Sequence, residues 1–137
     1  MGNFFGCLGP RGMVLSNENL KLHALRGAIT AKGNTIEWIE TAVNELISEL
    51  IFRNKLEADQ IISITFSVTA DLNACFPASI ARKNPGWEKI ALLDCQQMAV
   101  QGDLKNCIRM LALAWLPPQQ DAKHPYLGEA KHLRPDR

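Results

Sequence analysis

The amino-acid sequence predicts a single domain of the α/β (α+β) class, in which helices pack on a mixed β-sheet. Residues 61–68 alternate apolar side chains with Ser and Thr, which is typical of a half-buried strand. Residues 34–54 carry apolar side chains three and four positions apart, which indicates an amphipathic helix. Residues 107–116 form an apolar run with one charge, as in a buried strand, and 137 residues suit one domain.

The chain begins with residues 1–19, a Gly-rich stretch without periodicity that we expect to be a flexible N-terminal extension of the folded domain, 20–137. A first strand is predicted over 20–30. Arg26 is expected at the end of this strand, because the following Gly27 permits a bend or a close approach of another backbone segment.

A helix is predicted next. Asn34 and Glu37 have the spacing of a capping box, so the helix is expected to begin there and to run to about Asn54, with Ile36 in its apolar stripe. The chain then turns into the strand that begins at Ile61. A strand, a helix and a strand in this order predict a crossover with the two strands parallel.

The second half of the chain predicts shorter elements. Pro77 suits the first position of a short helix that ends at Arg82. The sequence Asn-Pro-Gly-Trp over 84–87 is a strong turn signal, and residues 96–98 are expected in a loop. The remaining predicted elements are a strand over 88–95, a helical turn over 103–106, a buried strand over 107–116 closed by two prolines, and a last short strand over 128–133.

Composition excludes several classes of function. The 15 Lys and Arg residues nearly balance the 14 Asp and Glu residues, so we expect neither a nucleic acid nor an anionic membrane as partner. The apolar run over 110–116 is too short to span a bilayer, and no secretory signal is evident, which predicts a cytoplasmic protein.

Metal and cofactor motifs are also missing from the sequence. No dinucleotide-binding, Walker, zinc-protease or nucleophile-elbow motif occurs, and the three histidines lack ligand spacing, so we expect no metal and no cofactor. The cysteines have no CxxC spacing and are expected to be reduced, buried thiols. They are Cys7, Cys75, Cys95 and Cys107.

Four arginines at expected strand or helix ends are the remaining candidates for chemistry. A guanidinium group matches a carboxylate in a bidentate way, so several arginines in one pocket would suit a small substrate with more than one carboxylate. The alternative is that each pairs with a surface acid or extends into solvent. These residues are Arg26, Arg82, Arg109 and Arg134.

Several separated motifs, in order, resemble the AroH-class monofunctional chorismate mutases. The motifs are Leu-Arg-Gly-Ala-Ile-Thr at 25–30, the segment 67–78 with Arg82, Gly-Trp at 86–87, Gln-Gln-Met at 96–98, the segment 102–109 and Leu-Arg-Pro-Asp at 133–136. The resemblance implies a homotrimer built as a pseudo-α/β-barrel, a fold shared with RidA-like proteins, with an active site in each intersubunit cleft. It also implies the Claisen rearrangement of chorismate to prephenate, on the route to phenylalanine and tyrosine.

The resemblance also implies roles for individual residues. Arg109 would donate to the ether oxygen, while Arg26 and Tyr126 would bind a carboxylate of the substrate. Phe76, Ala78 and Arg82 would come from the neighbouring subunit. The other implied substrate-binding residues are Ser79, Leu92, Leu93, Asp94, Gln97, Leu133 and Arg134. The implied catalytic residues are Arg109, Gln97 and Arg26.

Three positions depart from the pattern of the bacterial members of that family. Gln97 replaces a glutamate that accepts from the substrate hydroxyl, Ser79 replaces a lysine and Asp94 replaces a cysteine. A Gln amide oxygen can still accept a hydrogen bond but lacks the negative charge, which would lower the rate. We hypothesise that Asp94 supplies the lost carboxylate.

Two other functions remain open at this point. One is a trimeric carboxylate-binding module that has kept the arginine pocket without useful catalysis, a reading motivated by Gln97. The other is an imine deaminase of the RidA-like group, which shares a similar trimeric architecture and also holds a carboxylate with arginine. Turnover of chorismate separates the first alternative from a mutase, and release of ammonia from an imino acid identifies the second.

Overall fold

A computed structural model describes residues 19–134 as a mixed α+β domain with one four-stranded sheet. The predicted flexible extension therefore lies, except for Asn19, outside the described residues, as do Cys7 and Asp136. The strands are β1 (Lys21–Thr30), β2 (Ile61–Val68), β3 (Ala91–Gln96) and β4 (Cys107–Leu116). The helices are α1 (Ile36–Asn54), α2 (Pro77–Ala81) and the 3₁₀ helices η2 (Ala58–Gln60), η3 (Trp87–Lys89) and η4 (Gly128–Leu133).

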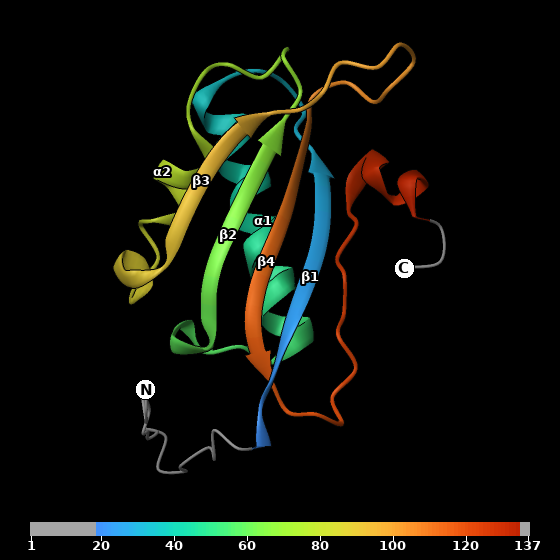
Figure 1. The fold of residues 1–137 in the computed structure, drawn as a ribbon. Coiled ribbons are helices and arrows are strands. Elements are labelled where there is room, and N and C mark those ends of the chain that lie inside the picture. Colours follow the sequence, from blue (N-terminus) through green and yellow to red (C-terminus); the bar gives the residue numbers. More distant parts are fainter. Residues whose placement is uncertain (1–18, 135–137) are drawn as a thin grey trace.

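The strand order is β1-β4-β2-β3, and α1 lies across one face of the sheet (Figure 1). Strand β4 is antiparallel to both β1 and β2, whereas β2 and β3 are parallel. Strands β1 and β2 consequently run in the same direction, as the predicted crossover requires, but β4 lies between them. Because β4 is the last strand in the sequence, its insertion depends on pairing between distant parts of the chain.

Helix α1 matches its predicted length, but its N-terminus is capped differently. The side chain of Thr35 accepts a hydrogen bond from the backbone N–H of Trp38 at 3.0 Å and is the N-cap. Asn34, which we predicted as the cap, instead accepts from the backbone N–H groups of Asn73 and Ala74 at 2.9 and 3.0 Å. Ile36 precedes the buried stripe and is 55 % exposed, so its predicted place in that stripe is wrong.

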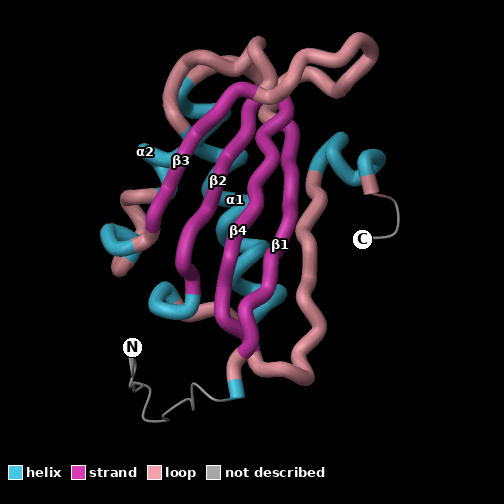
Figure 2. The backbone as a smooth tube through the Cα atoms, viewed as in Figure 1, coloured by secondary structure: helices cyan, strands magenta, loops and turns pink. Residues whose placement is uncertain are grey.

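The core lies between α1 and the sheet face that α1 covers. The side chains of Phe66 and Ile64 on β2 and of Ile108 on β4 are fully buried there, against Leu46 and Val43 of α1. No α-helix of the described chain crosses the opposite face of the sheet, as Figure 2 shows, and only η4 packs at one of its edges, through Ala130 against Ala28. Alternation along the strands places exposed apolar side chains on that face, notably Leu111 and Leu93.

The structure corrects three of the shorter predicted elements. Strand β3 begins at Ala91 rather than at residue 88, because Gly86, at φ 83°, leads into η3. Residues 103–106 form no helical turn, and Asn106 has a left-handed backbone with φ 53°. Residues 128–133 form the 3₁₀ helix η4 instead of a strand, with the side chain of Ala130 buried beneath it.

The cysteines of the described chain are free, but they are not uniformly buried. Cys107 is buried, Cys75 is half-buried and Cys95 is exposed, so the prediction of buried thiols is wrong for Cys95. Within residues 19–134, no three His, Cys, Asp or Glu side chains are grouped so that they could bind a metal ion. No helix in this range has the length and the apolar character that crossing a bilayer requires.

Candidate active site

A row of residues crosses the uncovered sheet face near one end of the strands. Arg109 on β4 pairs with Ser67 on β2 and with Ala28 on β1, so these residues lie side by side. Ala28 in turn forms a parallel bridge with Tyr126. The backbone of Gln97 continues the row beyond Ser67, because its N–H donates to the carbonyl of Val68 at 2.7 Å. Three of the predicted site residues therefore occupy one row: Arg109, Gln97 and Tyr126.

Arg109 carries the only charge on β4, and the structure gives it an acidic partner. Its Nη2 donates to Oδ1 of Asp103 at 3.2 Å, and both side chains are largely buried, with 26 % and 22 % exposed. Oδ1 of Asp103 also accepts from the backbone N–H of Leu104 at 2.8 Å. Sequence reasoning missed Asp103. The available signal was an acid directly after a glycine and six residues before Arg109. Gly102 has a positive φ of 86°, as in a turn.

Gln97 has its amide oxygen fixed by a neighbouring strand. The hydroxyl of Ser67 donates to Oε1 of Gln97 at 2.6 Å. A carbonyl oxygen has two lone pairs, so Oε1 can still accept one further hydrogen bond. The hydrogen bond from Ser67 therefore leaves Gln97 able to accept from a substrate hydroxyl, and this role stays a prediction.

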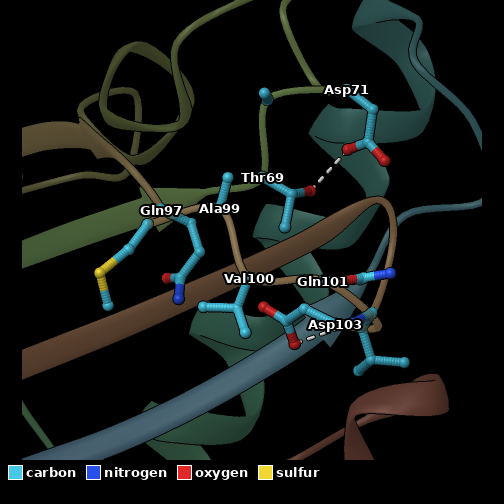
Figure 3. A pocket seen from close by; sticks show the side chains of 10 residues that line it. Thr69, Asp71, Gln97, Ala99, Val100, Gln101 and Asp103 are labelled. Atoms are coloured by element: carbon cyan, nitrogen blue, oxygen red, sulfur yellow. Dashed lines mark hydrogen bonds between the residues drawn. The ribbon is translucent and has the colours of Figure 1, made fainter.

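A cavity of about 400 Å³ lies beside this row. Figure 3 shows Gln97 and Asp103 among the side chains that line it, together with Val100 of the connecting loop. Asp71 ties the rim together, because it accepts from the hydroxyl of Thr69 at 2.6 Å and from the backbone N–H of Asn106. The cavity is thus bounded by the loop that joins β3 to β4.

Arg26 lies on the same sheet face as Arg109, but in the middle of its strand. Strand β1 continues to Thr30, so the predicted position of Arg26 at a strand end is wrong. Its side chain is exposed and its residue pairs with Leu111 of β4. The backbone N–H of Arg26 donates to Nδ1 of His124 at 3.0 Å.

Tyr126 reaches the site through a close approach between two backbone segments. A Cβ atom at Gly27 would lie 2.7 Å from the carbonyl oxygen of Pro125, so only glycine fits there. This confirms the close approach that Gly27 predicts. The backbone of Ala28 then bonds to this segment on both sides, donating to Pro125 at 3.0 Å and accepting from Leu127 at 2.8 Å.

The side chain of Tyr126 packs in a small buried cluster next to the row. Its neighbours in the cluster are Ala28, Cys107 and Ala130, with Leu133 packed against them. Burial raises the pKa of the Cys107 thiol, so this group is a neutral packing residue at physiological pH. Arg134, the last described residue, is half-buried at the same end of the chain.

The residues that the resemblance assigns to a neighbouring subunit lie on the other side of the sheet. Oδ1 of Asp94 accepts from the backbone N–H of Ala78 at 3.0 Å, which ties α2 to β3. The hydroxyl of Ser79 donates to the carbonyl of Phe76 at 2.7 Å. The Phe76 side chain is 69 % exposed, and Arg82, which ends α2, is exposed as well.

Asp94 lies with Ala78 and Arg82 on the α1 side of the sheet. Burial raises the pKa of its carboxyl, while the Ala78 hydrogen bond and the charge of Arg82 act in the opposite direction. Asp94 pairs with Phe66, whose side chain faces α1, whereas Ser67 and Gln97 meet on the opposite face. Within one chain, Asp94 therefore does not stand beside Gln97.

The two predicted β3 leucines divide between the two faces. Leu92 pairs with Ile64 and packs against the core beneath α1. Leu93 is 62 % exposed on the uncovered face. The structure thus gathers the predicted site residues into two groups on opposite faces of one sheet, and it does not bring Arg82 to Arg109 within a single chain.

A family model and two named relatives match most of this chain. The model of the family chorismate mutase type I matches residues 22–137. A protein named chorismate mutase AroH from Bacillus subtilis (strain 168) is 34 % identical over 118 residues, which cover 85 % of this chain and 93 % of that protein. One of the same name from Thermus thermophilus is 38 % identical over 118 residues, or 84 % of this chain and 95 % of that protein.

A solved structure supports the same relationship at the level of the fold. The structure of a chorismate mutase from Clostridium thermocellum superimposes with a TM-score of 0.74 at 42 % sequence identity. The match covers 80 % of this chain and 98 % of that one. The four-stranded sheet and its helices are therefore an arrangement that the two proteins share.

Proposed function

This chain belongs to the chorismate mutase type I family, and from that premise we propose that it converts chorismate to prephenate at a site built around Arg109. The enzyme is an isomerase, and the reaction serves the biosynthesis of phenylalanine and tyrosine. The observation that carries the assignment of Arg109 is its position: a largely buried guanidinium on an otherwise uncharged strand, beside Gln97 and a cavity of about 400 Å³.

The rearrangement is intramolecular, since one carbon–oxygen bond breaks while one carbon–carbon bond forms within the same molecule. It requires no proton transfer, nucleophile or redox step, so the protein contributes by holding the reactive conformer and by stabilising developing charge. Negative charge accumulates on the ether oxygen as its bond to the ring breaks. Arg109 donates to Asp103 through Nη2, and a guanidinium has further N–H groups that can donate to that oxygen.

The remaining residues bind the substrate. Chorismate carries two carboxylates, and Arg26 on the same face, with Tyr126, is suited to hold one of them. Gln97 would accept from the ring hydroxyl through the second lone pair of Oε1. Leu133 and Arg134 would close the C-terminal side of the pocket, next to the Tyr126 cluster.

We also propose that the working enzyme is a homotrimer with a pseudo-α/β-barrel of packed sheets and intersubunit sites. The sheet face that carries Arg109 has no α-helix of the described chain over it, and Leu22, Leu93 and Leu111 are 51, 62 and 45 % exposed there. Exposed leucines on an uncovered sheet face are typical of a subunit interface. The family resemblance implies that Phe76 and Arg82 of a neighbouring subunit complete the site at Arg109, and this arrangement is part of the proposal.

The other two functions from the sequence analysis are less well supported. The family match and the named relatives favour catalysis over mere binding of a carboxylate, and they favour a mutase over an imine deaminase. In this proposal Asp94 anchors α2 through Ala78. The Asp94 near a given Arg109 would therefore belong to the neighbouring subunit. A cytoplasmic location remains a prediction from the sequence.

The direct test is to mix the purified protein with chorismate and to follow the loss of its ultraviolet absorbance. Prephenate is confirmed by acid conversion to phenylpyruvate. Arg109→Ala should lower kcat by about 10²–10³-fold, as removal of an oxyanion-hole donor does, with a smaller change in KM. Arg53→Ala is the matched control. Arg53 pairs with Glu49 on α1, on the other side of the sheet from Arg109, so this variant should retain full activity.

The outcomes separate the possible functions. Saturable turnover that Arg109→Ala abolishes supports the mutase and the role of Arg109. Binding of chorismate without turnover would favour the carboxylate-binding module, and release of ammonia from an imino acid would favour a deaminase. An unchanged rate for a folded Arg109→Ala protein would remove Arg109 from the mechanism.

A further inference from the structure

Asp103 is an acidic side chain inside the proposed active site for which the reaction itself has no obvious use. The reaction moves no proton, and a carboxylate would repel an anionic substrate. Nevertheless the Asp103 side chain is only 22 % exposed and contacts Arg109 at 3.2 Å. Asp103 also lines the same cavity as Gln97 (Figure 3). This combination requires an explanation in terms of Arg109.

We propose that Asp103 is a positioning residue that orients the guanidinium of Arg109 for the transition state; this inference rests on the proposed function. The contact is monodentate, through Nη2 and Oδ1 only. A guanidinium has five N–H donors in a rigid plane, so a contact at one terminal nitrogen restricts the directions of the others without occupying them. The remaining Arg109 donors are thereby held beside the cavity that Asp103 lines.

The carboxylate is itself rigidly held, which a positioning residue requires. Oδ1 accepts from the backbone N–H of Leu104 at 2.8 Å, and the backbone N–H of Asp103 donates to the carbonyl of Val100 at 3.1 Å. The turn is completed by Gly102 at φ 86°. A group supported on both its backbone and its side chain loses little entropy when it holds Arg109, so the geometry of Arg109 is set before the substrate arrives.

Charge gives the proposal a second, independent consequence. Gln97 is neutral, so Asp103 is the carboxylate that contacts Arg109 in the described chain, and it offsets part of the positive charge that attracts a dianionic substrate. Asp103 therefore weakens binding of chorismate while it improves the rate of the bound substrate. A loop residue with only a structural role would not separate these two quantities in opposite directions.

The test compares Asp103→Asn with the wild type by steady-state kinetics and by calorimetric binding of chorismate. The Asn oxygen can still accept from Leu104 and Arg109, so the turn is kept and only the charge is removed. We expect kcat to fall on the order of tenfold, because a neutral acceptor holds the guanidinium more weakly. We expect chorismate to bind about two- to fivefold more tightly at low ionic strength, with the gain shrinking as salt is added.

A double-mutant cycle and a charge control complete the design. In an Arg109→Ala background, Asp103→Asn should cause no further loss of kcat, because the group that it positions is absent. Glu49→Gln removes one negative charge from α1, on the covered face of the sheet, and should change neither kcat nor affinity. Asp103→Ala removes the acceptor as well and should lower kcat further than Asp103→Asn.

The possible results decide between the proposal and the function on which it rests. Unchanged kcat in Asp103→Asn, or a fall of equal size in the Arg109→Ala background, overturns the positioning role. If the wild type binds chorismate without turnover, the proposed function fails, and unchanged affinity in Asp103→Asn then also rejects the contact as a determinant of binding. If the wild type neither binds nor converts chorismate, both proposals fail together.

Discussion

Leu111→Gln is a direct test of the proposed trimer. Leu111 is 45 % exposed on the uncovered face, so covering it would recover about half of the 1.5–3 kcal/mol for full burial of a leucine, or about 1 kcal/mol per chain. An unpaired amide buried in its place costs about 1–3 kcal/mol more. Each chain of a symmetric assembly presents the same patch, so the penalty is about 6–12 kcal/mol per trimer. Glutamine adds no charge beside Arg26, which pairs with Leu111.

The assay is sedimentation across a range of protein concentrations, with chorismate turnover measured on the same samples. We expect Leu111→Gln to dissociate and to lose activity at concentrations where the wild type stays assembled, while activity returns as concentration rises. Phe52→Gln is the control, because Phe52 is 79 % exposed on α1, and it should leave assembly unchanged. A Leu111→Gln protein that assembles and turns over like the wild type would refute the buried-face argument, as would a fully active monomeric wild type.

Two further predictions concern single charges. Gln97→Glu should raise kcat about tenfold, because a charged acceptor adds about 1.4 kcal/mol to the hydrogen bond from the substrate hydroxyl, and Ser67 already orients that acceptor. The same substitution should raise KM, because the added charge repels the anionic substrate. Steady-state kinetics that show a lower kcat would contradict this prediction. The pKa of Asp94 is raised above its ordinary value of 3.8, chiefly by burial, so the folded state binds this proton more strongly and loses stability as pH rises through that raised pKa. Asp94→Asn keeps an acceptor for the backbone N–H of Ala78. The free energy of unfolding of this variant should rise relative to that of the wild type as pH increases through this window. A difference in the free energy of urea unfolding that does not change with pH would exclude the effect.

Strands and helices with strong periodicity were predictable because their burial patterns are local. The alternation over Ile61–Val68 and the apolar run over Cys107–Leu116 coincide with β2 and β4. Weak signals were less informative. The segment 128–133 has strand-like composition, yet Gly128 takes φ 60° and Ala130 packs inward, so the segment coils into η4.

The candidate site shows the same division. The residues of the Arg109 row could be named from the sequence, through motifs that resemble a known family and through the lone charge on an apolar strand. Asp103 could not be named, because its importance depends on a turn at Gly102 that brings its carboxylate back to Arg109. The cap at Thr35 was missed for a related reason, since Asn34 has a better partner in the distant loop at Asn73.

The sequence by itself determined the class of the fold, the main helix, three of the strands closely and the chemical character of the site, because side-chain periodicity and short motifs depend on neighbouring residues alone. Only the tertiary structure decided that β4 lies between β1 and β2, and that one face of the sheet stays uncovered. It also decided that the Arg109 and Arg82 groups lie on opposite faces. These features depend on hydrogen bonds between strands far apart in the chain, whose free energy no local pattern records.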